Sequence, residues 1–151
     1  MRKKDFLLGV LFTGVLFSVV SLILGSIITS KIYLTVTSMD VVSSTAEIVL
    51  IMKELEEEKV EHDYAATLLE RQLNRLKNTK ELTNASLNKG KEDGRYTDYE
   101  DSIQNIIDVV NELKDRVVTV EEINLEKDMK SFFNEVKYFG KSMETYMKRI
   151  W

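Results

Sequence analysis

His62, the only histidine of the chain, and the acidic residues around it are the side chains whose type and spacing could do chemistry. His62 stands in the stretch KELEEEKVEHD, four residues after Glu58. On a helix these two side chains share a face and could both ligate a metal ion. A metal site needs three or four ligands, and Lys59 occupies the position where di-iron helical bundles carry a glutamate. We therefore expect no metal and no other cofactor, and we interpret His62 as a polar residue on a helical seam.

No other catalytic constellation is visible in the sequence. The chain has a single histidine and no cysteine, and it has no glycine-rich phosphate-binding loop and no nucleophile motif. We expect that it is not an enzyme. The acidic balance, with a net charge of −4, argues against a nucleic-acid partner. A small-molecule ligand between helices is compatible with this composition, but no residue pattern supports one.

The element that must position everything else is an apolar N-terminal run. Residues 6–30 contain no charged side chain and would span roughly 37 Å as a helix, more than the ~30 Å core of a bilayer. Three basic residues precede the run and only Lys31 follows it closely, which predicts a cytoplasmic N-terminus. We predict a cytoplasmic tip (1–5), a transmembrane helix (6–30) and an extracytoplasmic domain (31–151) at the plasma (inner) membrane of a bacterium. The alternative is a cleaved secretory signal, although its apolar region is usually only ~7–15 residues long.

Small residues recur inside this run at spacings of four, three and four, which places them on one helix face. Small side chains allow close approach of helices in lipid. The pattern therefore predicts packing of the membrane helix against another helix; the alternative is that Gly and Ser are simply common in such spans. The residues are Gly14, Ser18, Ser21 and Gly25.

Apolar residues continue this phase beyond the span and predict two long helices. A first stripe (Ile28, Ile32, Met39, Val42, Ala46, Val49) shifts by one residue at Met52 and runs to Leu76. The polar segment 83–97 predicts a loop, and a stripe from Ile103 to Ile150 predicts a second helix. That stripe contains one step of five residues, between Val120 and Leu125. A restart at Thr119 would explain the step, but the absence of Gly and Pro nearby favours a continuous helix.

Helices 31–82 and 98–150 would each be about 80 Å long, and these matching lengths predict an antiparallel, coiled-coil-like helical hairpin. The fold class is therefore all-α. The second helix would return to the membrane surface, where basic and aromatic side chains are typical. Two helices bury little surface, so we expect a four-helix bundle formed by oligomerisation. The interface residues are Tyr33, Lys148, Arg149 and Trp151.

Acidic and aromatic side chains are the candidates for contact with a partner. In the hairpin the acidic run would face Glu121, Glu122 and Glu126, so that like charges gather at one level. A basic partner or a cation would offset this repulsion; the alternative is a solvated charged face. Two aromatic residues lie off the main apolar seam and are better placed for an exposed contact. The candidates are Glu54, Glu57, Glu58, Glu61, Phe133 and Tyr138.

The order of span, long helix, polar loop and returning helix, with helical stretches such as VVSSTAEIVLIMKELEEE and YEDSIQNIIDVVNELK, resembles the four-helix-bundle sensory region of bacterial chemoreceptors. The second span and the cytoplasmic signalling part of those receptors have no counterpart here. We therefore expect an interaction or scaffold subunit of an envelope or membrane complex, with the lipid bilayer and either itself or other membrane-anchored helical proteins as partners. The alternatives are a chemoreceptor-like sensory module, as the resemblance implies, and a phage-type envelope-spanning lysis protein.

Overall fold

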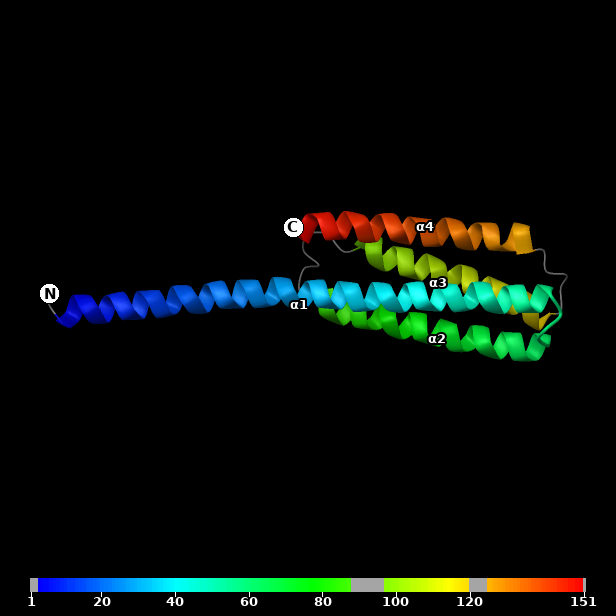
Figure 1. The fold of residues 1–151 in the computed structure, drawn as a ribbon, viewed down its shortest axis with the longest axis horizontal. Coiled ribbons are helices and arrows are strands. Elements are labelled where there is room, and N and C mark those ends of the chain that lie inside the picture. The colour runs from blue at the N-terminus through cyan, green and yellow to red at the C-terminus, as the bar shows by residue number, and fades with distance from the viewer. Residues whose placement is uncertain (1–2, 88–96, 120–124, 151) are drawn as a thin grey trace.

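The described part of the chain consists of four helices and contains no strand (Figure 1). The computed structural model describes residues 3–87, 97–119 and 125–150, with side chains for 17–85, 98–119 and 126–148. The helices are α1 (Lys3–Glu56), α2 (His62–Leu87), α3 (Thr97–Val118) and α4 (Leu125–Ile150). The predicted all-α class is confirmed.

The N-terminal half of α1 projects alone, whereas its C-terminal half packs against α2 and α4, with α3 across the core from it (Figure 1). The projecting part exposes large apolar side chains such as Phe17, Leu22 and Ile23. Within the described residues, α1 is the one helix long and apolar enough to cross a membrane, and it lies near the N-terminus. An apolar surface of this kind, which none of the described residues covers, is costly in water and favourable in lipid.

The first correction concerns the predicted helix 31–82, which the structure divides into α1 and α2. Glu58 adopts the left-handed conformation, with φ of 54°. The amide of Glu58 donates to the carbonyl of Leu55 at 3.1 Å, and the amide of Lys59 donates to that of Glu54 at 2.8 Å. This pair of bonds is the Schellman arrangement that ends helices, here with glutamate in the place that glycine usually takes. Glu58 therefore lies in a turn and does not share a helical face with His62.

The second correction concerns the predicted helix 98–150. Residues 120–124, where continuity was predicted, lie outside the described residues, but the flanking helices settle the question. Arg116 pairs with Asp128, and Asn105 donates to Glu135 at 3.0 Å. In one continuous helix, residues 12 and 30 positions apart would be roughly 18 and 45 Å apart. The chain therefore reverses between α3 and α4.

The predicted hairpin is thus folded in half, and one chain supplies four helical segments. Pairing across α2 and α3 keeps the register of the hairpin: Glu70 accepts a bond from Lys114 at 2.7 Å, and Gln104 accepts one from Lys80 at 2.6 Å. The apolar residues beside the seam of the second predicted helix divide, since Ile107 is buried whereas Val118 and Phe133 are exposed. Of the predicted loop 83–97, residues 83–87 are helical and 88–96 lie outside the described residues. The helices flanking it end at the base of the bundle, beside the projecting part of α1 (Figure 1), and not at the far tip.

The predicted apolar stripe of residues 28–49 is also corrected. The core side of α1 is formed by Leu34, Val41 and Ile48, whereas Met39 and Val42 are exposed. Serine and threonine residues complete the core side; the buried Ser44 hydroxyl has no hydrogen-bond partner among the described residues, whereas those of Thr37, Ser38 and Thr45 donate within α1, as Ser38 does to the carbonyl of Leu34 at 2.6 Å. These internal bonds satisfy the donating hydroxyls without breaking the helix. α1 therefore continues as a helix from Thr35 to Thr45.

Tyr99 joins three helices at the base of the bundle. It is fully buried, and its hydroxyl lies 3.0 Å from Ser38 Oγ and 3.2 Å from Thr37 Oγ1 of α1. Its ring packs against Phe139 and Tyr146 of α4, with centroids 5.3 and 5.7 Å apart. Burial raises the pKa of the Tyr99 phenol above its usual range, while the bonds from Ser38 and Thr37 act in the opposite direction. A single side chain of α3 thus fixes α1 and α4 together.

The α1–α2 turn predicts the sign of a glycine substitution. Glu58→Gly removes the steric penalty of a side chain in the left-handed region and should raise the free energy of unfolding by about 1 kcal/mol. Lys53→Gly, in the exposed last turns of α1, should lower it by about 1 kcal/mol. Thermal unfolding of the full chain in mild detergent, followed by circular dichroism, measures both. Destabilisation by both substitutions would show that the helix continues through residue 58.

Tyr99 predicts a loss of stability at high pH. Because its pKa is raised in the folded chain, the unfolded chain releases the phenolic proton first, above about pH 10. Stability should be complete below that pH and fall as the pH rises above it. Tyr99→Phe should cost about 1 kcal/mol at pH 8 through the lost hydrogen bonds and then decline less than the parent between pH 9 and 11. Equal declines in the two proteins would contradict this assignment.

Candidate interaction surface

α1 carries apolar side chains on two opposite faces. One face packs in the bundle through Leu34, Val41 and Ile48, which are 2%, 0% and 0% exposed. The opposite face carries Ile32 and Met39, which are 58% and 67% exposed. At about 100° per residue the two sets lie roughly on opposite sides of the helix. The fold of the chain explains the first face and leaves the second uncovered.

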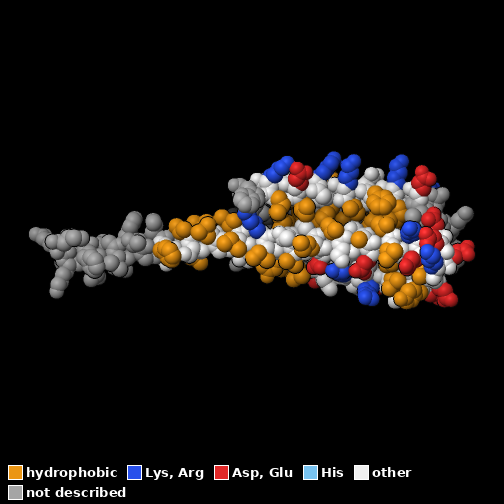
Figure 2. All heavy atoms as spheres, viewed as in Figure 1, with side chains coloured by type: hydrophobic (Ala, Val, Ile, Leu, Met, Phe, Trp, Pro, Cys, Tyr) orange, Lys and Arg blue, Asp and Glu red, His pale blue; other side chains and the backbone are white. Residues whose placement is uncertain are grey.

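The uncovered face continues into the seam between α1 and α4. Figure 2 shows hydrophobic side chains gathered along this seam and onto the projecting part of α1. A cavity of about 420 Å³ opens near the base of the bundle. Its apolar lining comes from both helices and includes Leu34, Met39 and Val42 of α1 with Met143 and Met147 of α4. Methionine side chains are flexible and adapt to different apolar partners.

A second cavity of about 610 Å³ lies at the far end of the same seam. Glu56 lines it from α1, and Glu126, Met129, Lys130 and Phe133 line it from α4. The ring of Phe133 is half exposed and stacks edge-on against Phe132 at a centroid distance of 6.0 Å. This cavity therefore combines a half-exposed aromatic ring with two carboxylates and one lysine.

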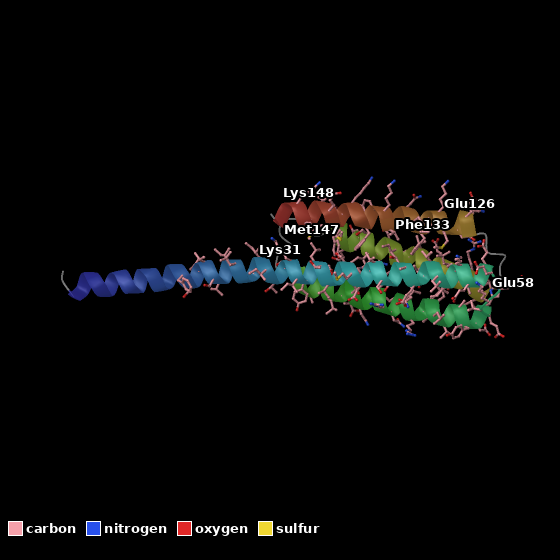
Figure 3. The ribbon with its side chains drawn as sticks, in the orientation of Figure 1. Lys31, Glu58, Glu126, Phe133, Met147 and Lys148 are labelled. Atoms are coloured by element: carbon pink, nitrogen blue, oxygen red, sulfur yellow. The ribbon has the colours of Figure 1, made fainter. Side chains whose placement is uncertain are left out.

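The acidic candidates lie where α1 turns into α2, at the end of the bundle far from the projecting part of α1 (Figure 3). Glu57, Glu58 and Glu61 are exposed, and Glu54 is partly buried. The predicted opposition to Glu121 and Glu122 falls on residues outside the described part. Lys59 pairs with Glu57, and this bond lowers the pKa of the Glu57 carboxyl and raises the pKa of the Lys59 amine. The acidic residues therefore lie at one end of the bundle, and not midway along two long helices.

The structure places the two aromatic candidates differently. Phe133 belongs to the distal cavity, whereas Tyr138 is exposed on α4 and lines neither of the cavities described above. The exposed acidic residues Glu57, Glu58 and Glu61 also lie outside the lining of both cavities. The sequence analysis did not predict that Glu56, Met143 and Met147 would line cavities. These residues line cavities with Phe133 and Leu34 because α1 and α4 are neighbours. The predicted hairpin does not by itself show that the seam between α1 and α4 is open.

The small residues of the span lie on the projecting part of α1. Ser18, Ser21 and Gly25 are exposed, and Gly14 lies where side chains are not described. A Cβ atom added at Gly25 would meet no heavy atom within 4 Å. The intrachain fold therefore does not require glycine at this position.

The interface candidates come to one level at the base of the bundle. Lys148, at the end of α4, lies beside the part of α1 that carries Lys31 (Figure 3), and Tyr33 is exposed there. The side chain of Arg149 and all of Trp151 lie outside the described residues. The described members are thus positioned where α1 leaves the bundle.

His62 has a structural role at the distal end. Its Nδ1 lies 3.3 Å from the carbonyl oxygen of Val117, in the last turn of α3, where carbonyls lack helical partners. Among the described residues, no group of three or more His, Cys, Asp or Glu side chains could hold a metal ion. The predicted absence of a cofactor remains a prediction.

No family model, curated protein or solved structure matches this chain. The chemoreceptor resemblance remains a prediction drawn from the order of its elements.

Two adjacent valines test the orientation of α1. Val41 is fully buried and Val42 is 56% exposed. Val41→Ala should lower the free energy of unfolding by about 2 kcal/mol, whereas Val42→Ala should change it by less than about 0.5 kcal/mol. Thermal unfolding of the monomeric chain at low concentration in detergent provides the comparison. The reverse order would restore the predicted stripe as the core side.

Proposed function

We propose that this protein is a membrane-anchored interaction subunit that binds another protein of the cell envelope. The observation that carries the proposal is the uncovered apolar seam between α1 and α4, which joins an apolar projecting helix to a bundle with polar outer faces. Apolar patches of this extent mark interaction sites in soluble domains. The charge bias of the sequence supports a plasma-membrane location with the N-terminus in the cytoplasm and the bundle outside.

The distal cavity is the best candidate site for that other protein. Phe133 offers a half-exposed ring of the kind that dominates binding at interfaces, and Glu56 and Glu126 line the same cavity. A partner with an apolar side chain beside basic residues would match both features. This combination favours a protein partner with a basic contact surface.

An affinity-tagged chain recovered from native membranes should co-purify with at least one other envelope protein identified by mass spectrometry. Phe133→Asp should reduce that recovery at least about fivefold, because it removes the aromatic ring and places a charged group against the partner's apolar side chain. Tyr64→Asp is the matched control, since Tyr64 is an exposed aromatic residue on α2. Recovery of the chain with no other envelope protein, or equal loss with both variants, would contradict the proposal.

A sensory module is the second candidate, and the cavity at the base of the bundle favours it. Its volume of about 420 Å³ lies in the range of small-molecule pockets, and its lining is mostly apolar. An apolar ligand would raise the melting temperature of the purified chain by binding only the folded state. Absence of stabilisation across a library of apolar metabolites would argue against this candidate.

A further inference from the structure

The outward face of α1 follows a strict repeat of three and four residues. The repeat positions from the end of the predicted span onward are Ile28, Ile32, Thr35, Met39, Val42 and Ala46, and all of them are exposed. The Thr35 hydroxyl donates to the carbonyl of Lys31 at 2.8 Å, so its hydrogen bond is made within α1. A repeat of this kind places side chains on the seam between two helices that wind around each other.

The same repeat extends without a phase change into the apolar N-terminal half of α1, through Gly25, Ser21 and Ser18. α1 is one uninterrupted helix over this whole length. A helix that covers the outer face must therefore follow α1 from the span into the bundle. Such a helix is itself rooted in the membrane and runs parallel to α1.

The charges around the face allow a second copy to be that helix. No repeat position carries a charge, and the acidic residues Asp40 and Glu47 beside the face share an ion pair with one arginine. Arg75 of α2 pairs with Asp40 at 3.1 Å and with Glu47 at 3.5 Å. Two identical faces can therefore meet without bringing unpaired carboxylates together.

The available area also suits a second copy. Ile28, Ile32 and Met39 each expose more than half of their surface, as do Val36, Val42 and Leu50. On two facing copies this apolar area is on the order of 1,000 Å², the size at which specific interfaces become stable. In a parallel arrangement about a twofold axis, each repeat position meets its own counterpart.

We propose that a second copy of the chain packs in parallel on this outward face of α1, so that the protein is a dimer joined along α1. This inference rests on the proposed function, because it names one partner of the same uncovered seam. It leaves the distal cavity available for the other envelope protein.

Single-cysteine cross-linking tests the interface in membranes, because the chain has no cysteine of its own. Met39→Cys, Val42→Cys and Ala46→Cys should each form a disulfide-linked species of twice the 17.5 kDa chain mass when membranes containing the full chain are oxidised. Asn74→Cys and Lys77→Cys, on exposed positions of α2, are matched controls. The α1 variants should yield at least about fivefold more dimer, since only they bring the two sulfurs within bonding distance. Circular dichroism of each reduced variant verifies the fold.

Equal dimer yields from α1 and α2 positions would overturn the proposal, as would monomer alone at all positions. Adducts of another mass from the α1 positions would also overturn it and would identify a different membrane-rooted helix as the occupant. If no other envelope protein binds at the distal cavity, the Phe133→Asp recovery experiment shows it, and these cross-links are unchanged. The two experiments therefore separate failure of the dimer from failure of the proposed function.

Discussion

The presence of apolar side chains on two opposite faces of α1 is the constraint on which the rest of the structure depends. Its 54 residues place an apolar surface on the core side and another on the opposite side. The other three helices can cover only the first of these, because α2 and α4 occupy the flanks of α1 and α3 lies across the core. The second surface must lie against something outside the chain, and this requirement underlies both proposals.

Polar groups in the bundle are arranged so that the core tolerates them. Ser38 and Thr37 bond within α1 and also reach the Tyr99 hydroxyl, so a phenol and two hydroxyls are satisfied in a buried place. The carboxylate of Asp128, which is almost fully buried, pairs with Arg116. Such internal pairs avoid the cost of unsatisfied buried groups. The bonds of Tyr99 join α3 to α1, and the Arg116–Asp128 pair joins α3 to α4, so these contacts also help to specify how the helices pack.

The sequence predicts many of the buried apolar residues of α3 and α4 correctly, but it does not predict the turns between the helices. The stripe from Ile103 to Val117 is buried as predicted, as are Met129, Phe132 and Phe139. The turn at Glu58 was missed because glycine and proline are the usual signals for a helix end, and here a glutamate takes the left-handed conformation. Weaker signals were present. The polar residues Lys59 and His62 interrupt the first stripe, and the five-residue step after Val120 interrupts the second, each next to a reversal of the chain.

The two apolar faces explain why the stripe of residues 28–49 was assigned to the core. Met39 and Val42 belong to a regular heptad-like repeat, which is typical of a core seam. The observed core side instead combines Leu34, Val41 and Ile48 with serine and threonine. Periodicity identifies a surface that avoids water, but it does not state which neighbour covers that surface. The open seam and its two cavities depend on this choice, so they could not be located before the helices were placed.

The uninterrupted course of α1 has a mechanical consequence. No turn or loop separates the part that belongs to the bundle from the apolar part that projects from it. A helix of this length, about 80 Å, acts as a stiff lever, so a tilt or axial twist applied at the distal end is delivered to the N-terminal segment instead of being absorbed by a linker. Any load placed on the outer end of the bundle is therefore felt at residues 3–30.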